Sequence, residues 1–176
     1  MKTISKFIAL AAFAVSATAV QAQLYGEVGY SALKFNNASS VPTYNASPRA
    51  LGATIGYDVH KNVAVEAMGV FGVKGSSING TSDMYSLNSS YGVFVKPKVI
   101  LGEDFEIFGR LGYMNSKMSA SGPGTPSSLT SSSLAYGLGA NYYLTKTTYL
   151  TASYINLYNK NNMKVDGVTF GLGMKF

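Results

Sequence analysis

The chain ends with Val168-Thr169-Phe170-Gly171-Leu172-Gly173-Met174-Lys175-Phe176, in which every second residue is apolar and the last is aromatic. Small or polar residues fill the alternate positions, so the segment is expected to form a β-strand with one apolar face. The ends of soluble domains commonly fray. A strand this regular at the terminus favours a sheet that closes on itself, because closure needs a last strand that pairs as well as the first.

The first residues have the pattern of an export signal. Lys2 and Lys6 precede an apolar run over residues 7–20, and Val20-Gln21-Ala22 has the small residues of a cleavage site. This pattern predicts a secretory signal peptide over residues 1–22, removed after Ala22. The apolar run is too short for a membrane helix. We therefore expect one mature domain over residues 23–176.

The composition narrows the class of that domain. The chain has no cysteine, so neither disulfides nor thiolate metal sites are available. Charged residues make up 12% of it, about half of the ~25% usual in soluble domains. Beyond the signal, no apolar stretch reaches the ~20 residues of a membrane helix. A weakly charged exported chain of this kind can still enter a bilayer as a closed β-barrel, where every backbone group is paired.

Eight segments alternate between apolar and small or polar residues with a period of two. They cover residues 24–35, 49–59, 63–73, 87–99, 105–115, 133–144, 148–156 and 165–176. Three connections are long (36–48, 74–86 and 116–132), one is intermediate (157–164), and three are short (60–62, 100–104 and 145–147). Long loops on one rim and tight turns on the other predict an all-β fold, an eight-stranded antiparallel up-and-down transmembrane β-barrel. Both termini then lie on the short-turn rim, which is expected to face the periplasm.

The two faces of the predicted strands differ in charge. The face that includes Val28, Leu51, Leu138 and Phe170 is expected to contact lipid and to carry no charge within the spans. The opposite face is expected to line the lumen. Its charged residues are Glu27, Asp58, Glu66, Lys96, Lys98, Glu106, Arg110 and Lys175.

Four acids and four bases in a narrow lumen predict a paired network, since a lone buried charge is costly. Glu27, Glu66 and Lys96 fall at a similar height, and Arg110 falls slightly deeper. We expect these four to interact, with Asn141 as a neutral neighbour. The alternative is that some of them are hydrated in a wet lumen.

Glycine and proline raise two further expectations. Inward-facing glycines are expected to make room for Tyr25, Phe94, Phe108 and Tyr143. Pro97 falls inside the fourth predicted strand although proline removes a ladder donor, which indicates a bulge or the end of that strand.

At this point the chain resembles the small eight-stranded outer-membrane barrels, such as the transmembrane domain of outer membrane protein A and the opacity-type surface proteins. The resemblance covers residues 23–176. It rests on Leu24-Tyr-Gly-Glu-Val-Gly-Tyr30, on Tyr136-Gly-Leu-Gly-Ala-Asn-Tyr142 and on the terminal strand. It implies a place in the outer membrane of a Gram-negative bacterium, and recognition of the strand ending at Phe176 by the barrel assembly machinery. Related chains often carry an acid where this one has Asn141, a departure that argues against a family-type gating pair there.

Catalytic and cofactor sites are not expected. His60 is the only histidine, and it falls in a predicted periplasmic turn without a nucleophile and an orienting group beside it. Asp83 has no neighbouring carboxylates for calcium. Gly137-Leu-Gly139 lacks the further glycine of a dinucleotide loop. We therefore predict a protein that is not an enzyme, holds no cofactor or metal and binds no nucleic acid.

The excess of positive charge falls on the predicted loop rim. Its charged residues are Lys34, Arg49, Lys74, Lys117, Lys160 and Lys164 against Asp83 and Asp166. Our hypothesis is that Lys34, Arg49, Lys74 and Lys117 bind the phosphates of lipopolysaccharide. The alternative is that these side chains only keep the rim solvated.

Three functions of different class remain open. The leading one is a structural surface barrel that anchors in outer-membrane lipid and presents its loops to an unidentified host or cell-surface ligand. The second is a narrow porin-like channel for ions or small solutes. The third is a soluble secreted barrel with its apolar face inward.

Overall fold

The computed structural model describes residues 24–37, 44–77, 84–121, 127–160 and 162–176. The predicted signal peptide and Asp83 lie outside these residues. Ten strands cover almost all of the described chain. They are β1 (Leu24–Asn37), β2 (Tyr44–Ala46), β3 (Arg49–His60), β4 (Val63–Lys74), β5 (Ser76–Ser77), β6 (Met84–Leu101), β7 (Phe105–Ser121), β8 (Ser127–Tyr143), β9 (Thr148–Lys160) and β10 (Met163–Lys175). Among the described residues, no helix is long and apolar enough to cross a membrane.

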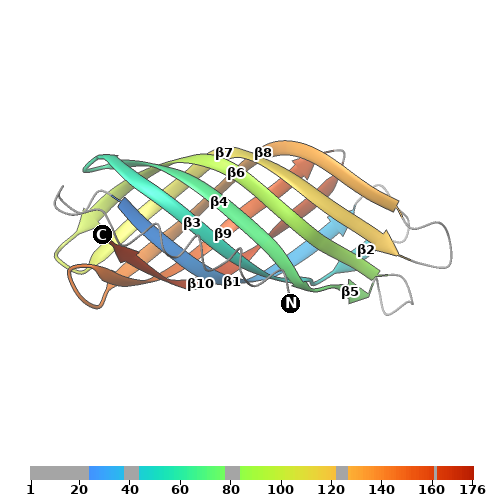
Figure 1. Ribbon diagram of the computed structural model, residues 1–176, viewed down its shortest axis with the longest axis horizontal. Helices are drawn as coiled ribbons and strands as arrows, with labels where there is room; N and C mark the ends of the chain where they lie inside the picture. The colour runs from blue at the N-terminus through green and yellow to red at the C-terminus, as the bar shows by residue number, and fades with distance from the viewer. Residues whose placement is uncertain (1–23, 38–43, 78–83, 122–126, 161) are drawn as a thin grey trace, which may run out of the picture.

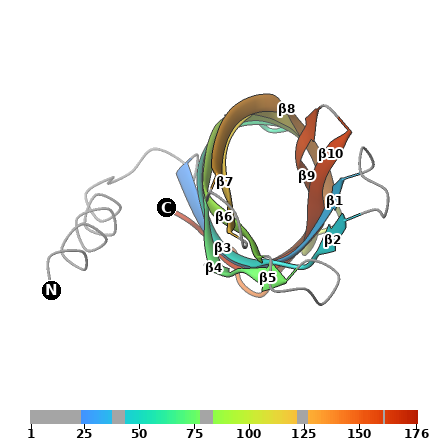
Figure 2. The same ribbon diagram turned by 90° about the vertical axis from the view of Figure 1, so that its right-hand side faces the viewer.

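The eight long strands pair with their neighbours in chain order and close into a barrel (Figures 1 and 2). The closing contact joins β1 to β10 without a break, from Tyr25 opposite Lys175 to Asn37 opposite Met163. The two short strands are accessory, because β2 pairs only with β1 and β5 only with β6. The structure thus confirms the predicted eight-stranded antiparallel up-and-down barrel.

The beginning of β1 and the end of the chain meet at one rim of the barrel. The Phe176 amide donates a hydrogen bond of 2.9 Å to the Leu24 carbonyl. The three tight connections lie at the same rim, and Gly102 in one of them has a φ of 70°, which favours glycine. This end is called the turn rim below, and the opposite end is called the loop rim.

The outer surface of the barrel is apolar. Val28 is 62% exposed, Leu138 67% and Phe170 65%, and all three point away from the lumen. A soluble barrel would bury this face inside. The structure therefore disfavours the soluble alternative and matches a barrel surrounded by hydrocarbon.

Several strands extend further toward the loop rim than the sequence predicted. β7 continues to Ser121 and β8 begins at Ser127, so most of the predicted loop 116–132 is a paired ladder. The predicted loop 157–164 is a tight hairpin in which Asn162 has a φ of 59°. These boundaries were wrong because the serine of residues 116–132 and the asparagine of residues 157–164 are typical of loops, whereas a strand continues wherever its neighbour offers a partner.

Pro97 neither ends β6 nor creates a bulge. It pairs with Val63 of β4, and the register between β6 and β7 is the same before it, at Val95 opposite Leu111, as after it, at Lys98 opposite Phe108. The ladder between β6 and β7 is interrupted at Lys96 and Pro97, as the missing proline N–H requires.

The lipid-facing parity is not free of charge at the loop end of β1 and β10. Lys34 and Asp166 both occupy it, and they pair directly across the two strands. Asp166 also accepts a hydrogen bond from the Tyr154 hydroxyl, and its Oδ1 lies 3.6 Å from the Lys164 ammonium. A charged side chain near the interface costs only about 0–1 kcal/mol, against about 2–4 kcal/mol for Arg or Lys at the midplane. The prediction that the lipid-facing side carries no charge is therefore wrong only near the loop rim.

Candidate functional site: the filled lumen and the basic rim

Arg110 of β7 forms ion pairs with residues of two other strands, β1 across the lumen and β4 beyond β6. Its Nη2 lies 2.6 Å from Glu27 Oε2 on β1, and its Nε lies 2.6 Å from Glu66 Oε2 on β4. Arginine suits this position because its planar fork can serve two carboxylates at once. All three side chains are buried.

Lys96 of β6 lies at the centre of three carboxylates. Its ammonium is 3.4 Å from Glu27, 3.6 Å from Glu66 and 3.5 Å from Glu106. The ring of Phe108 lies 4.3 Å from the same ammonium, at cation–π distance. Lys96 is only 1% exposed, so its charge depends on these partners.

The remaining predicted lumen charges extend this cluster toward the turn rim. Lys98 lies 2.6 Å from Asp58 and 3.6 Å from Glu106, and Lys175 lies 4.0 Å from Asp58. All eight residues are thus linked by ion pairs into one cluster, which we call the ionic layer. Asn141 donates 2.8 Å to Glu106 and so joins it.

Tyrosine hydroxyls complete the ionic layer, a role that the sequence reading missed. Tyr25 donates 2.7 Å to Glu66, Tyr149 donates 3.0 Å to Glu27, and Tyr143 donates 3.2 Å to Glu106. The alternating pattern predicted that Tyr25 and Tyr143 point into the lumen, but only as large side chains that need space. Their hydroxyl bonds could have been suspected because a buried Tyr O–H usually finds a partner.

Two of these rings lie flat against glycines of the next strand. A methyl group at Gly56 would overlap the Tyr25 ring, and one at Gly173 would overlap the Tyr149 ring. Both pairs are direct cross-strand neighbours. Gly112 makes room for Phe94 and Gly139 for Phe108 in the same way, so the predicted packing against glycine is confirmed for Tyr25, Phe94 and Phe108.

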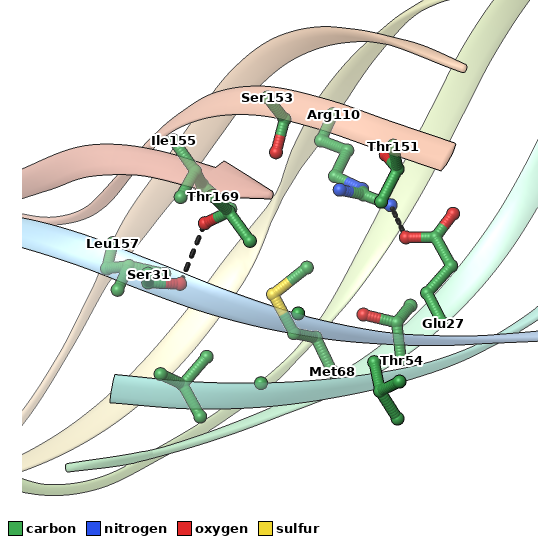
Figure 3. A pocket seen from close by; sticks show the side chains of 14 residues that line it. Glu27, Ser31, Thr54, Met68, Arg110, Thr151, Ser153, Ile155, Leu157 and Thr169 are labelled. Atoms are coloured by element: carbon green, nitrogen blue, oxygen red, sulfur yellow. Dashed lines mark hydrogen bonds and ion pairs between the residues drawn. The ribbon is translucent and has the colours of Figure 1, made fainter. Parts of the chain in front are cut away.

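A small hydroxyl-lined chamber lies next to the ionic layer on the loop side (Figure 3). Its volume is about 30 Å³, which is enough for one or two waters. The hydroxyls of Ser31 and Thr169 lie 2.7 Å apart in its wall, and Arg110 and Glu27 form its other end. The chamber is too small for a solute larger than water.

An apolar cluster fills the lumen beyond that chamber, and the sequence reading did not predict it. It contains Leu33, Phe35, Ala46, Ala50, Val70, Leu87, Phe94, Met114, Met118, Ala135, Ile155, Leu157, Tyr158 and Val165. We call it the apolar layer. The alternating pattern places Leu33 and Met114 on the inward face, and this could have indicated an apolar cluster in the lumen. The register shift in β9 could not be foreseen, and it brings Leu157 and Tyr158 into the cluster together.

The four predicted basic rim residues are all exposed, but only three lie together. Arg49 pairs with Lys74 across β3 and β4, and with Ala32 across β1 and β3, two residues from Lys34. Lys34, Arg49 and Lys74 thus form a contiguous basic patch on three adjacent strands. Lys117 pairs with Ser89 of β6, which separates it from that patch.

The described residues offer no arrangement for a metal ion, as no group of three or more His, Cys, Asp or Glu has suitable geometry. The glutamates of the ionic layer converge on ammonium and guanidinium groups instead. His60 is the exposed last residue of β3, and its Nδ1 accepts a hydrogen bond of 3.3 Å from the amide of Asn62 in the following turn.

Comparison with protein families gives a match over residues 6–176 to the family described as "Outer membrane protein beta-barrel domain". The chain belongs to this family. The barrel is therefore an outer-membrane protein of Gram-negative bacteria. A search of curated proteins gives no match.

Solved structures show the same fold. The attachment invasion locus protein Ail of Yersinia pestis is 21% identical, with 88% of this chain and 98% of Ail aligned and a TM-score of 0.67. Ail has also been solved with the heparin analogue sucrose octasulfate, with a TM-score of 0.66 to this chain. Neisserial surface protein A is 18% identical, with 87% of this chain and 97% of that protein aligned and a TM-score of 0.65. Identities this low establish the architecture only.

Proposed function

We propose that this barrel is a closed membrane anchor that presents its loop rim at the cell surface, and that it does not conduct. The observation that carries the proposal is the filled lumen. An ionic layer and an apolar layer lie in series along the axis, with only a water-sized chamber between them. The extended ladders of β6, β7 and β8 support the presenting role, because 17 or 18 residues exceed the ~9–11 that a tilted strand needs to span a bilayer.

Planar-bilayer recording tests whether the lumen is closed. The purified barrel should show no single-channel steps at potentials where a porin does. Steady channels from the unmodified protein would show that both layers open, and would favour the porin-like alternative.

We also propose that the basic patch of Lys34, Arg49 and Lys74 binds phosphate groups of lipopolysaccharide, with Lys117 as a separate contact. Its residues are exposed and face outward at the loop rim, where anionic head groups lie against the barrel. The test is lipopolysaccharide association of the barrel after Lys34, Arg49, Lys74 and Lys117 are changed together to Gln. Unchanged association would contradict the proposal. The Lys117→Gln variant alone is the matched control, and we expect it to lose much less.

Sulfated saccharides offer the same chemistry from outside the cell. Ail was crystallised with such a compound, and the basic patch of this chain could contact a sulfate as well as a phosphate. Direct binding of sucrose octasulfate distinguishes a patch that takes soluble sulfated compounds from one that takes only the phosphates of lipopolysaccharide. If sucrose octasulfate binds the unmodified barrel in lipopolysaccharide-free detergent, and does not bind a variant with Lys34, Arg49 and Lys74 changed to Gln, the patch serves soluble polyanions.

Three further proposals concern biogenesis and chemistry. Residues 1–22 are proposed as a signal peptide cleaved after Ala22, which N-terminal sequencing of the mature protein would test. The strand ending at Phe176 is proposed as the segment read by the barrel assembly machinery. We propose no enzymatic activity, since the charged side chains of the lumen are paired with one another and the chamber admits only water.

A further inference from the structure

A groove lies on the lipid-facing outside of the barrel, over β7, β8, β9 and β10. Its floor is Ala140 opposite Ala152. Bulky exposed side chains surround this pair, with Tyr142 and Leu150 toward the turn rim and Phe170 on the next strand. The hollow has a volume of about 310 Å³, at the lower end of the range of small-molecule pockets.

The position of the groove in the membrane defines which leaflet reaches it. Phe170 lies six residues from Phe176 at the turn rim. Six residues of a strand tilted by about 40° rise roughly 15 Å, which is half of the ~30 Å hydrocarbon core. The groove therefore extends from the turn-rim interface to about the middle of the bilayer, over the depth of one acyl chain. Given the orientation proposed above, this is the periplasmic leaflet.

Charges of both signs lie at the rim end of the groove. Lys146 is exposed in the turn between β8 and β9, and Glu103 and Asp104 are exposed in the turn between β6 and β7. The Tyr143 amide donates 2.8 Å to the Asp104 carbonyl, so the second turn packs against the end of β8. A cation beside two anions complements a head group that carries both a phosphate and an amine.

We propose that this groove binds one phospholipid whose head group is a phosphate ester of a primary amine, with an acyl chain over Ala140 and Ala152. The acyl chain fills the hollow that the two alanines leave among the larger side chains of the barrel exterior. Lys146 contacts the phosphate, and Glu103 or Asp104 contacts the ammonium. The surface of β3 and β4 has outward alanines as well, at Ala53 and Ala67, but neither pairs with another alanine.

The chain contains no tryptophan, which allows a single engineered reporter. Phe170→Trp keeps a large aromatic in the groove wall, and Val93→Trp reports from the exposed exterior of β6. Each variant is reconstituted in phosphatidylglycerol vesicles that contain a minor fraction of brominated-chain phosphatidylethanolamine, and quenching of the tryptophan is measured. We expect quenching at position 170 to correspond to a local mole fraction about threefold above bulk, and quenching at position 93 to match bulk.

Groove filling is the decisive comparison. Ala140→Leu with Ala152→Leu should return the Phe170→Trp signal to the bulk value, whereas the matched pair Ala53→Leu with Ala67→Leu should leave the enrichment intact. Quenching that stays enriched after filling, or that never exceeds bulk, overturns the site. Equal enrichment of brominated phosphatidylglycerol and brominated phosphatidylethanolamine, each tested as a minor component of phosphatidylcholine vesicles, overturns the head-group assignment. So does undiminished enrichment of phosphatidylethanolamine in the Lys146→Glu variant. A dimer found by cross-linking in the parent and lost on filling, without lipid enrichment, would show that a second copy occupies the groove. In symmetric vesicles the outcome does not depend on which rim faces the periplasm, so it is separable from failure of the proposed surface function.

Discussion

Arg110 and Glu27 form a buried ion pair of 2.6 Å that connects β7 to β1 across the lumen. The guanidinium is also shared with Glu66. Removing the arginine would leave Glu27 and Glu66 with a single buried cation, the Lys96 ammonium, which Glu106 also shares. We expect Arg110→Leu to lower the free energy of unfolding by about 3–5 kcal/mol, the usual cost of breaking a buried pair from one side.

Urea unfolding of the barrel from lipid vesicles measures this loss. Lys117→Leu is a suitable control because Lys117 is exposed near the loop rim, and it should change the stability by less than about 0.5 kcal/mol. Equal stability of Arg110→Leu and the unmodified barrel would mean that Lys96 balances the two glutamates without Arg110.

Conductance should depend on two layers, not one. Lys96→Ala opens the ionic layer, but the apolar layer beyond the chamber still excludes ions, since they would have to shed water to pass it. We expect no channels from Lys96→Ala alone, and none from Leu157→Ser with Met114→Ser. Their combination should produce measurable conductance in planar bilayers. Channels from Lys96→Ala by itself would assign the whole seal to the ionic layer.

Glycine beneath the lumen tyrosines should be irreplaceable. Gly56→Ala places a methyl group against the Tyr25 ring and forces it away from Glu66. We expect a loss of about 1–3 kcal/mol, typical of overpacking. Gly52→Ala on the same strand is the matched control, because its nearest neighbour would be 3.7 Å away. The same unfolding experiment should rank the two variants in that order.

The period-two pattern was sufficient to predict the barrel, because the inside and outside of a closed sheet impose opposite chemistry on alternate residues. It also placed Glu66 and Lys96 in the lumen. Matching heights along the strands also grouped these two residues with Glu27 and Arg110, as the ion pairs have them. The pattern did not give the contact between Lys96 and Glu106, which depends on how the strands are staggered around the barrel. It failed at the loop rim, where Lys34 and Asp166 occupy the lipid-facing parity, because the constraint against charge weakens beside water.

The groove at Ala140 and Ala152 could not be predicted from the period-two pattern either. Both alanines fit the lipid-facing pattern, and nothing in one strand alone distinguishes them from Ala53 or Ala67. Only the register, which places one alanine opposite the other and Phe170 beside them, produces a groove.

Phe176 should matter more for assembly in the cell than for the folded barrel. Its ring is 37% exposed on the outside, and its amide bonds the Leu24 carbonyl through the backbone, which any residue can supply. Phe176→Ala should therefore reduce unfolding free energy by no more than about 1 kcal/mol, because only a partly exposed ring is lost.

If the terminal strand is read by the assembly machinery, the same variant should accumulate unfolded in the periplasm, as judged by loss of the heat-modifiable band in membrane fractions. Met174→Ala, another outward residue of β10 that is 46% exposed, is the control. Equal assembly of the Phe176→Ala and Met174→Ala variants would remove the special role of the last residue.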